Sequence, residues 1–231
     1  MKPRWFFDEF QQTGTDFTDI KKVEAYDNKM SKFRNYRQEA AMVLDLFNAQ
    51  ASDVLLEIGT GTGHFAIEAA KRCRKVHAVD VSETMLKYAE LKARQENITN
   101  IEWRHSGFLT ADFPDVHFNF IFSNAAMHHL PDFWKALALR NIHRMLKPGG
   151  KFILGDVIFS CTIDETETKV QDWIEGFKKV DEDFFSESTG HIKKEYSTFS
   201  WIIEGMLERT CFSHKTVADM NNFMIYLCVK Q

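Results

Sequence analysis

Cysteine is scarce and unpaired in this sequence, which limits the kinds of site that the chain can build. The four cysteines, Cys73, Cys161, Cys211 and Cys228, form no Cys-x-x-Cys pair. Closely spaced pairs are the usual signature of structural zinc sites, and dense cysteine frameworks mark small secreted domains. We therefore expect neither a disulfide scaffold nor a zinc site. Reduced, mostly buried thiols of a cytoplasmic protein are the simplest interpretation.

Long hydrophobic runs and an excess of basic charge are missing as well. The apolar runs have the length of strands, such as Phe118 to Phe122, and none reaches the roughly 18 residues that cross a bilayer. Acids at Asp8 and Glu9 follow the first residues, so the start does not resemble a signal peptide. The formal net charge of −4 argues against nucleic-acid binding through bulk electrostatics. We expect neither a membrane nor a nucleic acid as partner.

Apolar material is plentiful and follows a regular order. Hydrophobic residues make up 44% of the 231 positions, enough for the core of one large domain. Short apolar runs alternate with longer helical patterns, which predicts βαβ units and a parallel sheet. Strands are expected over residues 54–58, 76–79, 101–103, 118–122 and 152–158, with a terminal pair over 212–217 and 223–229.

Two regions interrupt this alternation, namely residues 1–50, which are rich in aromatic side chains, and residues 160–210. Helices are expected in them over 33–47, 165–180 and 199–208. Thr198 is a candidate cap for the last of these. Because open α/β sheets bind ligands at the carboxyl ends of their strands, we expect both regions to cover that edge. The single domain 1–231 then divides into an N-terminal helical lid (1–50), a cofactor-binding core (51–159), an inserted helical cap (160–210) and terminal strands (211–231).

The most informative stretch is Val54 to Phe65, which reads as strand, glycine turn and helix. Glycines at 59, 61 and 63 permit a tight turn and the close approach of a ligand to the backbone. The helix that follows offers free N–H groups at its positive end. Asp80 ends the next expected strand, where a carboxylate can accept both hydroxyls of an adenosine ribose. Each such charge-assisted bond contributes about 1.5–3 kcal/mol.

A glycine turn followed by an acid also describes nicotinamide-dinucleotide sites. The dinucleotide fingerprint needs a third glycine at position 64, where this chain has His64. Glu57, just before the turn, would repel a pyrophosphate but can hold the ammonium group of a methionine, directly or through water. The pattern therefore favours S-adenosylmethionine over a dinucleotide.

Four motifs in order carry a resemblance to a known family. They are Glu-Ile-Gly-Thr-Gly-Thr-Gly at 57–63, Val-Asp-Val-Ser-Glu-Thr-Met-Leu at 79–86, Ser-Asn-Ala-Ala-Met-His-His-Leu-Pro-Asp at 123–132 and Leu-Lys-Pro-Gly-Gly at 146–150. Over residues 55–155 the chain resembles class I S-adenosylmethionine-dependent methyltransferases, most of all the small-molecule branch with the ubiquinone and menaquinone biosynthesis enzymes. The resemblance implies a doubly wound, Rossmann-like α/β fold, whose seven-stranded sheet is mostly parallel with an antiparallel last strand.

The resemblance also implies which residues surround S-adenosylmethionine. Gly59, Thr60 and Gly61 are expected to border the methionine part of the cofactor, and Glu57 and Gly63 belong to the same turn. Asp80 is expected at the ribose, and Val81 and Met85 are expected at the adenine. The backbone of Asn124 and Ala125 is expected near the sulfonium. The family often carries an acid after the third strand, where it meets the adenine amino group. Here that segment reads His-Ser-Gly-Phe at 105–108, so Ser106 or the backbone of Gly107 and Phe108 would substitute. Tyr26 and the Trp5–Phe7 cluster are candidates for aromatic contact with the sulfonium, or for covering the site.

Methyl transfer from a sulfonium is an in-line displacement, in which good placement of the reactants contributes roughly 7–11 kcal/mol. A general base is needed only if the acceptor must lose a proton. His128 and His129 are candidate catalytic residues, and bracing of their loop is the alternative. Asp156 could contact the substrate or simply end its strand, and segment 191–196 could line the acceptor pocket or form a surface loop. No metal is expected, because His143 lies a helix away from the other two histidines.

The expected function is therefore methyl transfer from S-adenosylmethionine to a small-molecule acceptor. A methyltransferase acting on RNA or protein is one alternative. A non-catalytic protein that binds S-adenosylmethionine or S-adenosylhomocysteine is the other, because fold alone does not establish turnover. The aromatic flanks are compatible with a homodimer.

Overall fold

A computed structural model describes residues 3–11, 17–32, 34–179 and 182–231. Its strands are β1 (Val54–Ile58), β2 (Lys75–Asp80), β3 (Ile101–His105), β4 (Phe118–Asn124), β5 (Leu146–Phe159), β6 (Thr198–Phe199), β7 (Phe212–Asp219) and β8 (Phe223–Lys230). Its helices are α1 (Ile20–Met30), α2 (Tyr36–Phe47), α3 (His64–Ala70), α4 (Glu83–Gln95), α5 (Asp132–Met145), α6 (Thr166–Lys178), α7 (Glu182–Lys194) and α8 (Ser200–Arg209), with a 3-10 turn η1 (Met127–His129).

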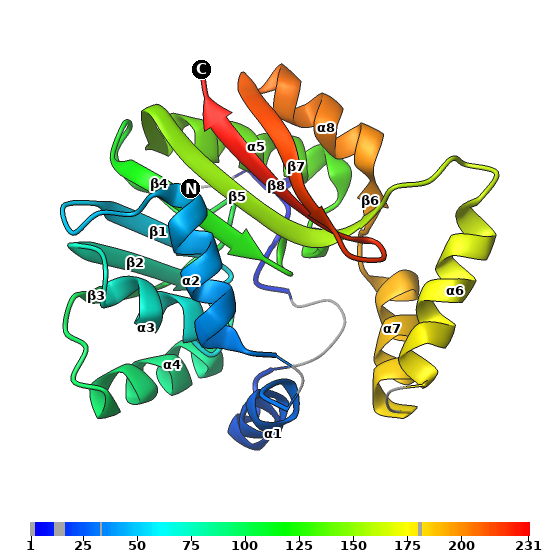
Figure 1. Cartoon of the computed structure of the whole chain (residues 1–231), viewed down its shortest axis with the longest axis horizontal. Coiled ribbons are helices and arrows are strands. Elements are labelled where there is room, and N and C mark those ends of the chain that lie inside the picture. Colours follow the sequence, from blue (N-terminus) through cyan, green and yellow to red (C-terminus); the bar gives the residue numbers. More distant parts are fainter. Residues whose placement is uncertain (1–2, 12–16, 33, 180–181) are drawn as a thin grey trace.

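Seven of the strands lie side by side in the order β3-β2-β1-β4-β5-β8-β7 (Figure 1). β1 to β5 pair in parallel, whereas β8 is antiparallel to both of its neighbours. The chain thus has the expected doubly wound α/β sheet, in which the last strand of the chain is the antiparallel one. The two-residue β6 pairs with the end of β5 and was not predicted, because two residues carry no periodic signal.

Helices cover both faces of this sheet, and α2 lies in front of it while α5 lies behind it in Figure 1. One hydrophobic cluster joins β1, β4 and β5 to α5 and α8, and a second joins the other sheet face to α2 and α3. β1 is buried along its whole length, as its mostly apolar sequence predicts for a central parallel strand, and its one acid, Glu57, is buried with it. Both layers therefore hold the carboxyl ends of the parallel strands at one fixed edge.

The helices of the two flanking regions correct several expectations. α2 begins at Tyr36 with Asn35 as its cap, and the predicted start at Phe33 lies outside the described residues. α6 ends at Lys178, and the predicted end at Val180 also lies outside them. Thr198 does not cap α8, because its hydroxyl donates instead to Asp132 Oδ2 at 3.1 Å. α1 and α7 were not predicted.

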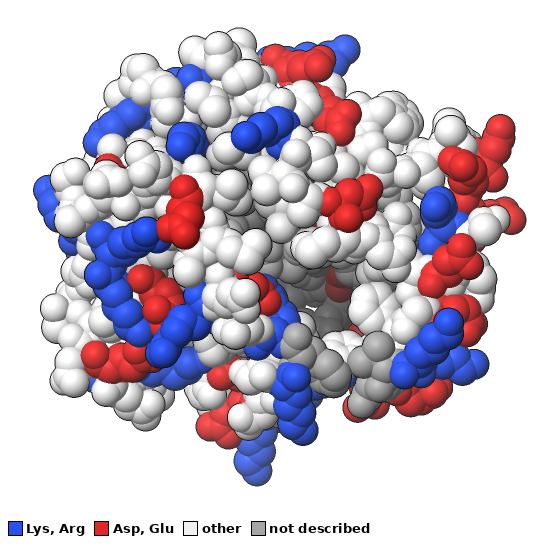
Figure 2. Space-filling model, in the orientation of Figure 1, with Lys and Arg blue, Asp and Glu red and all other residues white. Residues whose placement is uncertain are grey.

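Of segment 191–196, for which a surface loop was one expectation, residues 191–194 form the end of α7, and Glu195 and Tyr196 follow the helix. α7 packs against α6, and this pair of helices stands beside the sheet. α1 lies apart from the pair and contacts α4 (Figure 1). The space-filling view is hollowed between these two sides, and acidic side chains are visible inside the hollow (Figure 2). Within the described residues, no helix is both long and apolar enough to span a bilayer.

Candidate active site

The turn between β1 and α3 is shaped by glycines and tied to the end of β2. Gly59 and Thr60 both donate their backbone N–H to the carbonyl of Val79, at 2.9 and 3.0 Å. Added Cβ atoms on Gly59 and Gly63 would lie 2.5 and 2.6 Å from neighbouring alanine side chains, and both glycines have positive φ. At Gly61 nothing lies within 4 Å of an added Cβ. The outer two glycines thus serve packing, and the middle one leaves open space for a ligand.

Asp80, at the end of β2, is buried and oriented by backbone donors. Its Oδ2 accepts from Gly61 N at 2.7 Å, and its Oδ1 accepts from Ser82 N at 2.8 Å. Burial raises the pKa of this carboxyl. Because a carboxylate offers about four lone-pair sites, Asp80 keeps capacity to accept from a ligand hydroxyl. The geometry suits the ribose contact that the sequence predicts.

Glu57 is buried below the turn, where its Oε2 accepts from the Thr60 hydroxyl at 2.6 Å. Burial raises the pKa of Glu57 to about 8, because the low-dielectric surroundings disfavour the charged form. A cationic group beside this carboxyl would reverse that effect. The ammonium of a bound amino acid is such a group, so the environment fits the expected methionine end.

Glu9 is a site residue that sequence reasoning missed. Its carboxylate accepts from Leu109 N at 3.1 and 3.0 Å and from the Thr110 hydroxyl at 2.6 Å. A Cβ added to Gly107 would lie 2.5 Å from Glu9 Oε2 and 2.8 Å from Val81 Cγ1. The N-terminal lid therefore places a carboxylate, on a residue that is only 8% exposed, where a side chain at 107 would stand. Glu9 thus adds a carboxylate to the segment after β3, in which the sequence itself carries no acid at residues 105–108.

The other residues expected at the cofactor differ in whether their side chains and backbone groups are free to contact a ligand. Met85 and Phe108 are buried in the core, and Gly107 N donates to the Thr110 hydroxyl. Ala125 has its backbone N–H engaged with the Gly155 carbonyl at 2.8 Å, so that donor is already used. Asn124, at the end of β4, points its Oδ1 at the same glycine, 2.5 Å from where a Cβ on Gly155 would lie.

Helix α1 is held against the glycine turn by one buried carboxylate. Asp27 accepts from the Thr62 hydroxyl at 2.7 Å and from Lys92 Nζ at 3.0 Å, and it lies 2.6 Å from His64 Nε2. Although burial opposes ionisation, the hydrogen bonds from these three side chains hold the pKa of Asp27 below its usual range. The neighbouring Tyr26 packs edge-on against Phe17, and burial raises its phenol pKa. The position of Tyr26 on the lid fits a covering role.

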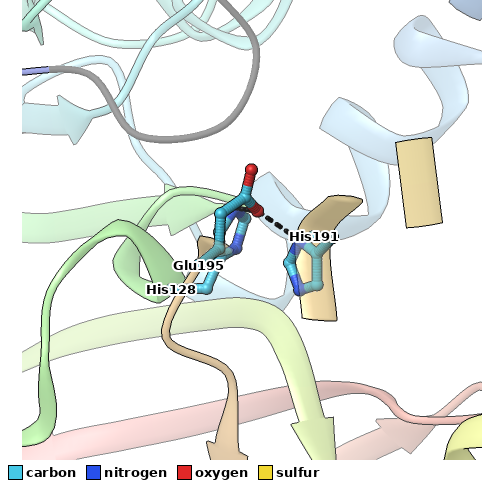
Figure 3. A group of neighbouring side chains, drawn as sticks. All are labelled: His128, His191 and Glu195. Carbon is cyan, nitrogen blue, oxygen red and sulfur yellow. Dashed lines mark ion pairs between the residues drawn. The ribbon is translucent and has the colours of Figure 1, made fainter. Parts of the chain in front are cut away.

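A second buried polar cluster, here called the His128 group, comprises His128, Asp156, His191 and Glu195. His128 Nδ1 lies 2.5 Å from Asp156 Oδ1, and the backbone N–H of His128 donates to Asp156 Oδ2 at 3.1 Å. Its Nε2 lies 3.4 Å from Glu195 Oε2, which also contacts His191 (Figure 3). The group thus joins the carboxyl ends of β4 and β5 to the last turn of α7.

The two adjacent histidines have opposite electrostatic environments. Burial alone would lower the pKa of His128, but Asp156 and Glu195 raise it. Burial and the neighbouring His128 lower the pKa of His129 to about 4. His143 packs against Phe212 and takes no part in the His128 group. The structure therefore brings His128 and Asp156 together as a pair, whereas His129 is a neutral neighbour.

Comparisons with known proteins agree with this arrangement. Residues 55–150 match the family described as a methyltransferase domain. A demethylmenaquinone methyltransferase of Listeria welshimeri is 25% identical over 184 residues, covering 78% of this chain and 74% of the relative. A relative of the same description from Geobacillus stearothermophilus is 29% identical over 126 residues, covering 53% of each chain.

Solved structures show the same fold. A putative S-adenosylmethionine-dependent methyltransferase of Methanococcus maripaludis superposes with a TM-score of 0.67 at 19% identity, covering 96% of this chain and 97% of the other. A phosphoethanolamine N-methyltransferase of Haemonchus contortus, in complex with S-adenosylmethionine, gives a TM-score of 0.61 at 18% identity, over 84% of this chain and 52% of the other. Residues 55–150 therefore carry a methyltransferase domain, and the chain resembles the quinone-biosynthesis methyltransferases in sequence and shares the fold of S-adenosylmethionine-dependent methyltransferases.

Proposed function

We propose that the chain binds S-adenosylmethionine in the turn between β1 and α3 and transfers its methyl group to a small molecule held against the His128 group. The observation that carries this proposal is the pairing of two built half-sites at one sheet edge. One half is the open turn at Gly61 with the oriented Asp80, at the ends of β1 and β2. The other half is the His128 group at the ends of β4 and β5.

The residues of the first half fit the cofactor from end to end. Glu57 would face the ammonium group, Asp80 the ribose hydroxyls, and Val81 with Glu9 the adenine. The sulfonium supplies the methyl group, while the protein aligns the two reactants and excludes water. Asn124 and Ala125 end β4, the strand between β1 and β5, so they would border the reacting centre. The N-terminal lid and the inserted cap would close over the two halves.

The second half fits an acceptor that can donate hydrogen bonds. Asp156 and Glu195 supply carboxylate oxygens that are largely shielded from water. Buried polar atoms need hydrogen-bond donors, and here side chains of the His128 group provide them. A hydroxyl or amine on a compact acceptor would satisfy the same oxygens. The Listeria relative is a demethylmenaquinone methyltransferase by name, and this supports a small-molecule acceptor rather than a macromolecule. A nucleic acid is disfavoured by the net charge of −4 and by the mixed charges seen on the hollowed face (Figure 2).

We further propose a cytoplasmic enzyme that can form a homodimer. Free thiols at all four cysteines fit a reducing compartment. Trp5, Phe133 and Trp201 are exposed apolar side chains that a second copy could cover. The molar mass in solution, measured by light scattering at two protein concentrations, tests the dimer; a mass that stays at 26.9 kDa contradicts it.

Two measurements test the main proposal. S-adenosylhomocysteine at saturating concentration should raise the melting temperature of the chain, and Asp80→Ala should abolish most of this shift. The matched control is Glu83→Ala, which changes an exposed acid three positions further on. Incubation with methyl-labelled cofactor and a metabolite extract should then yield one labelled small product. A stabilising ligand without any labelled product would leave a binding protein rather than an enzyme.

A further inference from the structure

The His128 group contains a set of side chains that can bind a metal ion. His128, His191 and Glu195 each offer one donor atom, and the three donor atoms lie within 4.8 Å of one another. They come from two separate segments, η1 after β4 and the end of α7, and they point toward a common centre (Figure 3). The 3.4 Å between His128 Nε2 and Glu195 Oε2 matches two ligands of a tetrahedral ion, whose ligand bonds are about 2.0–2.2 Å long.

The outer nitrogen of each histidine is held by a second partner. His128 Nδ1 is bound by Asp156, which is only 2% exposed, so the ring is fixed with Nε2 facing inward. His191 Nε2 lies 2.6 Å from the Ser197 hydroxyl, which leaves its Nδ1 facing Glu195. A carboxylate or hydroxyl on the far nitrogen is the arrangement that orients histidine ligands of metal ions and raises their basicity. Both rings are therefore prepared to donate to one centre.

The charge of the group also favours a cation. Asp156 and Glu195 are two carboxylates in a largely buried cluster, and buried charges require compensation. The nearby ammonium of Lys135 is engaged with Asp132 Oδ1 at 2.8 Å and with the Tyr196 carbonyl. Compensation within the group thus falls to the histidines, and a dication at their inner nitrogens can replace their protons.

We infer that His128, His191 and Glu195 bind one divalent transition-metal ion, such as zinc, with a fourth position open for the acceptor. Two histidines and one carboxylate with an open position form the donor set of catalytic zinc and related metal sites. The sequence argument against a metal considered His143, whereas this set joins His128 to residues more than 60 positions further along. His191 and Glu195 are four residues apart, so they share one face of a helix.

The use of this ion deepens the proposed function and rests on it. An acceptor hydroxyl at the open position would have its pKa lowered, as happens for water on a bound metal ion. The hydroxyl proton leaves to solvent, an O–CH₃ bond forms, and the S–CH₃ bond of the cofactor breaks to leave a neutral thioether. No further reactant is required. The acceptor class is then a small molecule with a hydroxyl group able to reach the ion.

The test is metal binding by the full chain, after treatment with a chelator and removal of that chelator. Titration with zinc against a chromophoric competitor should give one site per chain, and cobalt(II) should give the visible absorption of a four- or five-coordinate ion. His191→Ala and the conservative Glu195→Gln should each weaken binding at least tenfold and remove the cobalt spectrum. His214→Ala, on β7, is the matched control and should leave both unchanged. Far-ultraviolet circular dichroism confirms that each variant is folded.

The outcomes separate this inference from the proposed function. If the wild-type chain binds neither zinc nor cobalt, or if both variants bind as well as wild type, the metal site is overturned. Should binding of S-adenosylhomocysteine and methyl transfer persist in that metal-free protein, the proposed function still stands. If one metal binds but S-adenosylhomocysteine does not, the metal site stands and the proposed function fails.

Discussion

The N-terminal lid and the inserted cap resemble each other in how they contribute to the proposed site, although one acts at the cofactor half and the other at the acceptor half. Each is a helical segment that brings a carboxylate from a distant part of the chain to the carboxyl edge of the sheet. The lid brings Glu9 to the turn after β3 and Asp27 to the glycine turn. The inserted cap brings Glu195 to His128. Under the proposed function, the core alone contains an incomplete site, whose cofactor half is completed by the lid and whose acceptor half is completed by the inserted cap.

The two regions also differ in how they are fastened to the core. Asp27 on α1 has four side-chain partners, which come from α3, α4 and the turn before α3. Phe6 and Phe7 of the lid pack against Trp134 on α5, with ring centroids 5.0 and 5.9 Å apart. The inserted cap is fastened by α8, which packs in the hydrophobic cluster with α5 and the sheet, and also by the short β6 pairing and the His128 group. A change in the cap should therefore act on the acceptor half and leave the cofactor half intact.

The largest expected effect is that of His128→Ala, which should reduce turnover at saturating cofactor by about 10²–10⁴-fold, the range for loss of a side chain that promotes ionisation of the acceptor. Binding of S-adenosylhomocysteine should stay within twofold, because His128 lies on the acceptor half. Steady-state rates and calorimetric titration measure the two effects, with His214→Ala as control. A parallel loss of cofactor binding would show that the halves are not separate.

Glu9→Gln addresses the cofactor half from the lid side. A charge-assisted hydrogen bond contributes about 1.5–3 kcal/mol, so affinity for S-adenosylhomocysteine should fall roughly 10- to 100-fold. Turnover at saturating cofactor should be retained. Asp8→Asn is the matched control, because it changes the adjacent acid, whose carboxylate caps the backbone N–H of Phe10. Equal affinities of the Glu9→Gln variant and wild type would mean that Glu9 only braces the turn at Leu109.

Part of this fold and site could be predicted from the sequence, and part could not. The strands, the glycine turn and Asp80 were predictable, because each is signalled by neighbouring residues along the chain. Glu9 was not predictable, and for Glu195 the sequence offered only its segment 191–196 as a possible lining of the acceptor pocket, because the partners Gly107 and His128 lie far away in sequence. α7 carries Ser, Thr and Gly in its middle, a composition typical of loops, so only its packing with α6 makes it a helix.

The pH dependence of cofactor binding tests Glu57, which belongs to the proposed cofactor half but comes from neither the lid nor the inserted cap. Glu57 has a raised pKa of about 8, so in the free protein it is mostly protonated at neutral pH. Binding an ammonium favours the carboxylate and releases that proton. Affinity for S-adenosylhomocysteine should therefore rise with pH between about 6 and 7.5, by up to tenfold per pH unit.

Calorimetry in two buffers of different ionisation enthalpy counts the released proton directly. Glu57→Gln cannot lose a proton, so its affinity should be flat over the same range, although weaker at the upper end. The same raised pKa means that the stability of the cofactor-free protein falls as pH rises from about 4.5 to about 8, because the unfolded chain ionises Glu57 there while the folded protein keeps it protonated. A pH-independent wild-type affinity would place the ammonium away from Glu57.

The smallest expected effect concerns the contact between the two regions. Lys29 Nζ on α1 lies 3.1 Å from Glu187 Oε1 on α7 and 3.9 Å from the centre of the Phe184 ring. The two charged side chains are 23% and 53% exposed, so solvent and salt screen the pair, and such pairs contribute about 0–1 kcal/mol. Lys29→Ala should therefore speed the release of S-adenosylhomocysteine by less than about fivefold. Part of that difference should vanish in high salt. Lys22→Ala, elsewhere on α1, is the control, and stopped-flow fluorescence follows the release. An effect of tenfold or more would mean that the lid and the cap open as one unit, and that the division into two independent halves is wrong.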